Sequence, residues 1–399
     1  MNKPPLEIAD VLREGFSDYN ETYGPLQPDQ YKVANAIMAC RTAALGGHID
    51  KCDQCSHERI SYNSCRNRHC PKCQALARAQ WVELRMRDLL PVPYFHAVFT
   101  LPAQLNAFAL RNKKVFYGIF FEAVSETLQT FAHDQKYLGG EIGVISILHT
   151  WGQNLLDHPH IHCVVPGGGL VGNSRWKHCG KGFLFPAKAM SALFKGKMLD
   201  YFKTAVENHE IELSGSLQQY ASYVAFSELL TALYKTQWIV YVKPPFAGPK
   251  AVLKYLGRYT HRVAISNNRL TSLTDTCASF RWKDYADNNR QKTMTLSVTE
   301  FIRRFLLHVI PGGFVRIRYY GFLSNRCRKE KLELCMKNLG VKLPDNAVAH
   351  EPQSRHWYDI VKWLTGKDPT ICPVCGKGHM KTYREIARSL VPLERWEAA

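Results

Sequence analysis

The strongest constraint on the fold comes from two C-x-x-C pairs near the N-terminus. Cys52 and Cys55 form the first pair, Cys70 and Cys73 form the second, and fourteen residues separate them. This spacing is typical of a four-cysteine zinc site, and residues 48–73 are too short and polar to build an apolar core alone. We therefore predict that Cys52, Cys55, Cys70 and Cys73 bind one zinc ion. The alternative is a set of plain buried thiols.

Four more potential metal ligands lie close to these pairs in the sequence. They could form a second zinc site, which would make a two-metal module. Cys65 and His69 could instead only pack or form hydrogen bonds. The four residues are Cys40, His48, Cys65 and His69.

A third pair, Cys372-x-x-Cys375, lies near the C-terminus and is followed by GKGHM, which includes His379. The pair resembles half of a zinc ribbon, so it needs two further ligands. We predict that Cys327 and Cys335 supply them. Three isolated cysteines are expected to pack in the interior or to lie on the surface: Cys163, Cys179 and Cys277.

Composition narrows the class of protein. The 399 residues carry a net charge of +18, and such an excess points to nucleic acid or another polyanion. No apolar run of about 18 residues occurs, so we expect no membrane span. The N-terminus lacks a basic stretch followed by an apolar one, so we expect no secretory signal and a cytoplasmic protein. In that compartment, C-x-x-C pairs favour metal binding over disulfides.

Hydrophobic periodicity predicts a mixed α+β chain of three domains. Residues 1–90 should form a helical and zinc-binding domain, 91–270 a central domain, and 271–399 a basic region with the second zinc site. Helices are predicted at 5–22, 28–44, 74–90, 103–135, 187–210, 226–236 and from Pro249, and strands at 91–102, 143–150, 160–166, 238–242, 278–285 and 292–297.

The stretch HPHIHCVVPGGG, residues 158–169, combines three histidines with an apolar run. In a strand, His160 and His162 share one face because alternate side chains point the same way. Two imidazoles so placed can bind one divalent ion if a neighbouring segment supplies a third ligand. His149 or Gln153 could supply it. The alternative is a half-buried strand whose histidines only form structural hydrogen bonds.

Tyr255 and Tyr259 lie four residues apart in a predicted helix, so both hydroxyls project from one face. Together with a metal site and a basic chain, the pair suggests tyrosines that attack DNA phosphate. Three basic residues surround the pair and could offset phosphate charge: Lys254, Arg258 and Arg262.

Three segments occur in the order of the motifs of HUH endonucleases: FHAVFTLP (95–102), HPHIHCVVPGGG (158–169) and YLGRYTHRVAISNNRL (255–270). The residues of these segments resemble those of rolling-circle transposases of the insertion-sequence-91 type, which are bacterial relatives of Helitrons. NSCRNRHCPKCQ, RIRYYGFLSNR and CPVCGKGHM resemble flanking modules of the same family.

The resemblance implies an HUH core with a central antiparallel sheet, packed helices and flanking zinc modules. His160 and His162 match the metal histidines, and Tyr255 and Tyr259 match the two-tyrosine motif. Such enzymes nick single-stranded DNA at an element end, keep a 5′-phosphotyrosine bond and transfer the strand to a target. Mg²⁺ or Mn²⁺ would occupy the histidine site and Zn²⁺ the cysteine sites. The expected location is the bacterial nucleoid.

For the third metal ligand the resemblance favours His149, because related conjugative relaxases space a third histidine in the same way. Gln153 and His158 remain alternatives.

Residues 301–337 contain nine Lys/Arg and two acidic residues, which predicts a DNA-binding segment. Arg316, Arg318 and Arg326 are the expected contacts. Tyr319, Tyr320 and Phe322 could stack on unpaired bases, or they could be core residues of a solvated strand edge.

Two other functions fit the sequence. One is a plasmid replication initiator or relaxase with the same chemistry. The other is a zinc-dependent DNA-binding regulator without catalysis, for which the two tyrosines would be dispensable.

Overall fold

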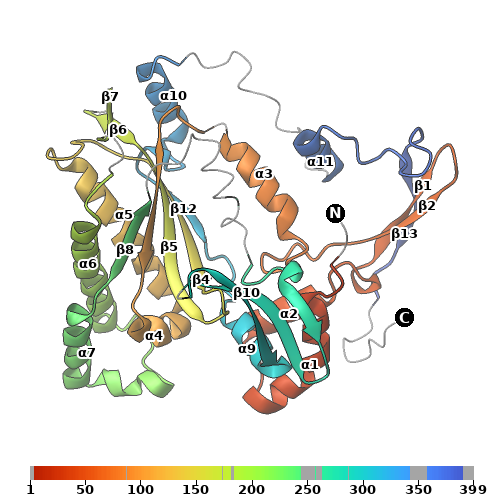
Figure 1. Cartoon of the computed structure of the whole chain (residues 1–399), viewed down its shortest axis with the longest axis horizontal. Coiled ribbons are helices and arrows are strands. Elements are labelled where there is room, and N and C mark those ends of the chain that lie inside the picture. The colour runs from red at the N-terminus through yellow and green to blue at the C-terminus, as the bar shows by residue number, and fades with distance from the viewer. Residues whose placement is uncertain are drawn as a thin grey trace.

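The computed structural model shows a mixed helix and sheet architecture (Figure 1). The predicted tyrosine-helix residues Lys254, Tyr255, Arg258, Tyr259 and Arg262 lie outside the described residues. The structure describes residues 4–86, 88–172, 174–180, 184–243, 257, 263–285, 287–341 and 357–389.

A five-stranded antiparallel sheet forms the centre, in the order β12-β4-β5-β3-β8. The predicted antiparallel sheet is therefore confirmed, with the histidine strand β5 in the middle. Burial along β4 is continuous because both faces of the sheet are covered. The strands are β3 (Tyr94–Thr100), β4 (Val144–Trp151), β5 (Asp157–Pro166), β8 (Ile239–Lys243) and β12 (Ile317–Tyr320).

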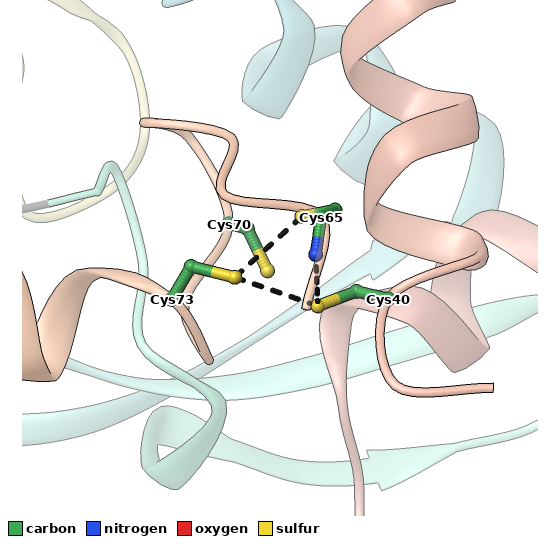
Figure 2. A group of neighbouring side chains, drawn as sticks. All are labelled: Cys40, Cys65, Cys70 and Cys73. Atoms are coloured by element: carbon green, nitrogen blue, oxygen red, sulfur yellow. Dashed lines mark hydrogen bonds between the residues drawn. The ribbon is translucent and has the colours of Figure 1, made fainter. Parts of the chain in front are cut away.

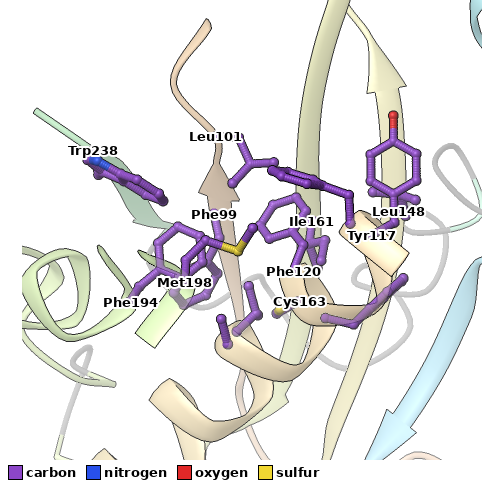
Figure 3. Close-up of a cluster of buried hydrophobic side chains, with 14 of the residues drawn as sticks. Phe99, Leu101, Tyr117, Phe120, Leu148, Ile161, Cys163, Phe194, Met198 and Trp238 are labelled. Carbon is purple, nitrogen blue, oxygen red and sulfur yellow. The ribbon is translucent and has the colours of Figure 1, made fainter. Parts of the chain in front are cut away.

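Long helices cover one face of this sheet. Alternate residues of each strand point into their packing, among them Phe99 on β3 and Ile161 on β5. Figure 3 shows these side chains meeting Phe120 and Phe194 from the helices. The helices on this side are α4 (Asn106–Arg111), α5 (Lys113–His133), α6 (Ala187–Glu207) and α7 (Tyr223–Lys235).

The opposite face carries the histidines. Ile147 and Val164 lie on this face beside them and pack in a second cluster with residues of α3 (Gln74–Met86) and α10 (Arg328–Asn338). A short hairpin of β6 (Gly168–Val171) and β7 (Arg175–His178) also contributes to this cluster. The two faces therefore differ: one is sealed by helices, and the other combines apolar residues with imidazoles.

A further core joins the N-terminal helices to a later part of the chain. Ser297 caps α9 by accepting a hydrogen bond from the Glu300 N–H, and Pro28 begins α2. Packing in this core crosses the predicted domain limits at residues 90 and 270, which remain predictions. Its elements are α1 (Ile8–Tyr23), α2 (Pro28–Met38), α9 (Val298–Leu307), β9 (Leu270–Leu273), β10 (Cys277–Asp284) and β11 (Arg290–Ser297).

A C-terminal strand joins a hairpin from the N-terminal region in a separate three-stranded sheet, in the order β13-β1-β2. The C-terminal strand β13 (Met380–Ile386) pairs antiparallel with β1 (Gly47–Cys52), which pairs with β2 (Glu58–Tyr62). In Figure 1 this sheet projects to the right of the main body, with α11 (Trp357–Thr365) between it and α3. The zinc modules predicted at the two termini are thus neighbours in space.

Candidate metal centres and active site

Three histidines converge on the face of the central sheet that lies opposite the long helices. His149 on β4 lies directly opposite His160 on β5, and His162 follows two residues along the same face. Their ligand nitrogens all lie within 4.8 Å of one another. Three imidazoles at this spacing can bind one divalent ion and leave coordination positions for substrate and water.

The hydrogen bonds around these rings determine which nitrogens face the cluster. His160 donates from Nδ1 to the His158 carbonyl at 2.6 Å, so the lone pair of the neutral ring is on Nε2. The ring of His149 stacks on Trp151, with 4.8 Å between the centroids. The orientation of both rings is therefore set by neighbours that are not ligands themselves.

His96 on β3 is a supporting residue that the sequence analysis did not single out. Its Nε2 lies 2.8 Å from His162 Nδ1, which leaves Nε2 of His162 for the cluster. Burial, with added repulsion from Lys243 and His160, lowers the pKa of His96 to about 3. His96 is therefore neutral near pH 7, and its Nε2 can accept a hydrogen bond from the Nδ1–H of His162. In the motif FHAVFTLP, His96 lies two residues before Val98, and Val98 pairs with His162 on the neighbouring strand. This spacing in the motif was the sequence signal that His96 shares the face of His162.

The structure distinguishes the candidates for the third ligand. His149 joins the cluster, whereas Gln153 donates to the Tyr285 hydroxyl at 3.3 Å. His158 contributes its carbonyl to His160, and its side chain is not part of the three-histidine group.

The first cysteine cluster consists of Cys40, Cys65, Cys70 and Cys73 (Figure 2). Cys73 Sγ lies 3.5 Å from Cys40 Sγ and 3.6 Å from Cys65 Sγ. Zn–S bonds of about 2.3 Å in a tetrahedron place sulfurs about 3.8 Å apart, so this cluster fits zinc. The hydrogen bond with Cys65 lowers the pKa of Cys40 to about 7, and the bond with Cys40 lowers that of Cys73.

The second cluster consists of Cys52, Cys55, Cys372 and Cys375. The predicted site of Cys52, Cys55, Cys70 and Cys73 is therefore wrong in its grouping. The reason is tertiary: β1 carries Cys52 into the terminal sheet, where it meets Cys372 and Cys375, while Cys70 is buried in the helical core. Sequence spacing alone does not distinguish these two partitions.

Cys327 and Cys335 are not near Cys372 and Cys375, so the predicted C-terminal set is also wrong. Cys335 is fully buried on α10 against the apolar cluster of the central sheet. Cys327 precedes α10 and lies 3.0 Å from the Ser324 hydroxyl. Cys335 therefore packs in an apolar core, as Cys163 does in the main core, whereas half-buried Cys327 forms a local hydrogen bond.

Of the possible second set, Cys40 and Cys65 belong to the first cluster, but the two histidines do not. His48 lies 3.5 Å from Asp50 in the terminal sheet. His69 is buried, and its Nε2 accepts a hydrogen bond from the Ile310 N–H. Burial lowers the pKa of His69 well below its ordinary value.

Comparisons with known proteins identify the family of the chain. A family model described as "Transposase zinc-binding domain" matches residues 11–101, and one described as "Putative transposase" matches residues 143–331. The "Putative transposase y4qJ" of Sinorhizobium fredii (strain NBRC 101917 / NGR234) is 48% identical over 98% of both chains. The "Transposase for insertion sequence element IS801" of Pseudomonas savastanoi pv. phaseolicola is 27% identical, over 88% of this chain and 83% of its own.

The chain belongs to the rolling-circle transposases of the insertion-sequence-91 type. No solved structure matches the transposase significantly. The family and the cysteine clusters support Zn²⁺ as a cofactor and DNA as the partner. None of the helices in the described part of the transposase is long and apolar enough to cross a membrane.

Within the predicted tyrosine helix of the transposase, Gly257 alone is described. A Cβ atom built on Gly257 would lie 2.6 Å from Cγ2 of Val82 on α3, a distance that real Cβ contacts do not show. Gly257 therefore lies directly against α3, whose residues Trp81 and Met86 pack on the histidine face of the sheet.

The basic segment of the transposase is more buried than predicted. Arg316 is 8% exposed, and burial lowers its pKa to about 10, so the predicted DNA contact is wrong for this residue. The guanidinium of Arg318 lies over the Phe121 ring at 4.4 Å and is half-buried. Arg326 is exposed and remains a predicted contact.

The aromatic residues predicted to stack on bases are also largely packed. Phe322 is fully buried, Tyr320 is half-buried, and the Tyr319 hydroxyl accepts a hydrogen bond from Trp81 Nε1 at 3.0 Å.

Proposed function

We propose that this transposase nicks single-stranded DNA at element ends through a 5′-phosphotyrosine intermediate and then transfers the strand. The observation that carries the proposal is the group of His149, His160 and His162 on one face of the central sheet. Three ligands from two adjacent strands make a rigid site, and a set of three protein ligands leaves coordination positions for substrate and water.

The donor set fits a catalytic divalent ion. The three imidazoles leave the remaining positions to water and phosphate oxygens, which are the ligands that Mg²⁺ and Mn²⁺ prefer, whereas four thiolates suit structural zinc. The ion would polarise the scissile phosphate and offset its charge. His96 and Trp151 are positioning residues, because they act through His162 and His149.

The proposed nucleophiles are Tyr255 and Tyr259. One phenolic oxygen attacks the phosphorus and forms the P–O bond to tyrosine, the phenolic proton passes to water, and the P–O3′ bond breaks to leave a 3′ hydroxyl. Transfer reverses this balance: an incoming 3′ hydroxyl attacks the phosphotyrosine and releases the phenol. The contact of Gly257 with α3 supports a tyrosine segment near the histidine face.

Lys254, Arg258, Arg262, Arg318 and Arg326 are the proposed phosphate contacts. The net charge of +18 supports binding to a polyanion, and phosphate contacts supply most of such affinity.

The test is incubation of the purified chain with 5′-labelled and 3′-labelled single-stranded element ends and Mn²⁺. We expect a covalent adduct that retains the label 3′ of the cut, and a free 3′ hydroxyl on the other product. The Tyr255→Phe, Tyr259→Phe double variant should form no adduct, whereas Tyr223→Phe, at an 85% exposed tyrosine of α7, should behave like the wild type. Normal adduct formation by the double variant would exclude Tyr255 and Tyr259 as the nucleophiles. The alternative function, a DNA-binding regulator without catalysis, would then have to be considered again.

A further inference from the structure

The second cysteine cluster joins parts of the chain that are more than 300 residues apart. Cys52 Sγ lies 3.7 Å from Cys375 Sγ, and Cys55 Sγ lies 3.6 Å from Cys372 Sγ. These separations match the sulfur spacing of about 3.8 Å in a four-thiolate zinc site and far exceed a disulfide bond of about 2.05 Å.

Backbone geometry around the four sulfurs is suited to a metal. The N–H groups of Gln54 and Cys55 point at Cys52 Sγ, at 3.4 and 3.5 Å, and the Gly378 N–H points at Cys375 Sγ at 3.4 Å. Such donors stabilise thiolates. A Cβ on Gly378 would lie 2.5 Å from Cys52 Sγ, so only glycine lets the two turns approach this closely.

Neither family match accounts for this site. Residues 11–101 contain six cysteines, of which four form the first cluster and Cys52 and Cys55 are left as half a site. The other half, Cys372 and Cys375, lies beyond both matched ranges.

The terminal sheet has only a small apolar core among the described residues. Its apolar cluster consists of Cys52, Cys372 and Met380, with Cys375 packed against them. Polar contacts also join β13 to β1: besides the antiparallel backbone pairing, the His379 N–H donates to Asp53 at 2.8 Å, the Thr382 hydroxyl donates to Asp50 at 3.3 Å, and Lys381 forms an ion pair with Asp53 at 3.2 Å. These contacts are mostly exposed to solvent, so each contributes little to stability. So small a core cannot offset the conformational entropy of ordering three strands, and metal ligation would supply the missing free energy.

We propose that Cys52, Cys55, Cys372 and Cys375 bind one structural zinc ion that fastens the C-terminal segment, residues 357–389, onto the N-terminal hairpin. The transposase then holds two zinc ions, and the second is a clasp between the β1–β2 hairpin and the C-terminal segment. The clasp also keeps α11 against α3, the helix that packs on the histidine face. This inference does not depend on the nicking chemistry.

The test is zinc stoichiometry of the full-length chain by elemental analysis. We expect two zinc ions per wild-type chain and one in both the Cys52→Ser, Cys55→Ser and the Cys372→Ser, Cys375→Ser variants. The quadruple variant should also hold one, because both pairs serve the same ion. The matched control is Cys327→Ser, Cys335→Ser, which should keep two. Retention of two ions in the C-terminal double variant, or loss of both in the quadruple variant, would overturn the clasp.

A second measurement uses the wild-type chain, so it does not depend on variants that fold. Amide hydrogen exchange of β13 should accelerate when zinc is removed by a thiol-reactive mercurial, and it should recover when excess small-molecule thiol removes the mercurial and Zn²⁺ is added back. Unchanged protection of β13 after zinc loss would contradict the proposal. So would a zinc-free purified chain in which a disulfide joins a cysteine of the Cys52/Cys55 pair to one of the Cys372/Cys375 pair.

Discussion

The histidine cluster and the first cysteine cluster have similar numbers of metal ligands, three and four, but they differ in structure and in role. The three imidazoles come from two adjacent strands and lie within fourteen residues of sequence, from His149 to His162. The four thiols come from separate turns between Cys40 and Cys73, and two of them are fully buried in the core shared by α1, α2 and α9. A three-ligand site on a rigid sheet can exchange ligands, whereas a closed four-thiolate site serves the fold.

The largest expected effect is on catalysis at the open site. His160→Ala or His162→Ala should lower adduct formation about 1,000-fold or more, because several kcal/mol of charge stabilisation depend on the metal. DNA affinity should change little, because phosphate contacts from Lys and Arg supply it. Gel shift and adduct assays separate the two, with His133→Ala at the exposed end of α5 as the control. Parallel losses of binding and cleavage in a folded variant would contradict a catalytic role for these histidines.

Mild chelation should distinguish the two kinds of site without mutation. EDTA should stop adduct formation reversibly, with Mn²⁺ or Mg²⁺ restoring it, while the zinc content stays unchanged. The reason is that four thiolates hold zinc much more tightly than three imidazoles hold Mg²⁺ or Mn²⁺. Activity that returns only when Zn²⁺ is added back would place the essential metal at the cysteines instead.

The first cysteine site should matter most for stability. Cys70→Ser should remove one zinc and destabilise the chain by several kcal/mol, because Cys70 and Cys40 lie within the core of α1, α2 and α9. Cys372→Ser should affect only the terminal sheet, whose cluster is separate. Circular dichroism melting of both variants measures the difference; equal melting temperatures would show that the two sites are not structurally independent.

These contrasts also explain what could be predicted from the sequence. The alternation of His160 and His162 is a local property of a strand, so their shared face was predictable. The central antiparallel sheet was expected from the family resemblance of the motifs, not from this alternation. The grouping of cysteines was not, because C-x-x-C pairs are chemically interchangeable. Their partition depends on the pairing of β1 with β13, a contact across more than 300 residues. Arg316 was assigned to DNA because strand periodicity does not reveal which side of β12 the rest of the chain covers.

His96 shows a signal that was present but unused. A lone histidine in an apolar strand is most often structural, yet His96 shares the face of His162 and lies 2.8 Å from it. His96→Ala should weaken Mn²⁺ binding about 10- to 100-fold, as is usual when the partner of a ligating histidine is lost. His96→Gln, which keeps a hydrogen-bond acceptor, should recover part of the affinity. Calorimetric titration with Mn²⁺ measures both, and an unchanged affinity in a folded His96→Ala variant would remove its positioning role.

The smallest effect we expect comes from the contact between Gly257 and α3. In Gly257→Ala, the new methyl would lie 2.6 Å from Cγ2 of Val82, so the segment between the two proposed tyrosines must shift by a fraction of an ångström. Adduct formation should fall about 3- to 10-fold, because small misplacements of a nucleophile have costs of this order.

A second substitution, on the other side of this contact, should restore the rate that is lost in Gly257→Ala. Val82→Ala removes Cγ2, so the Val82→Ala, Gly257→Ala double variant should recover most of the lost rate, although Val82→Ala alone gains nothing. Gly196→Ala is the control, because a Cβ at this position of α6 meets no atom within 4 Å. Zinc content and melting temperature should stay at wild-type values in all four proteins, which separates a shifted nucleophile from a damaged fold. If the double variant were as slow as Gly257→Ala, the contact with α3 would not be what positions the tyrosines against the histidine face.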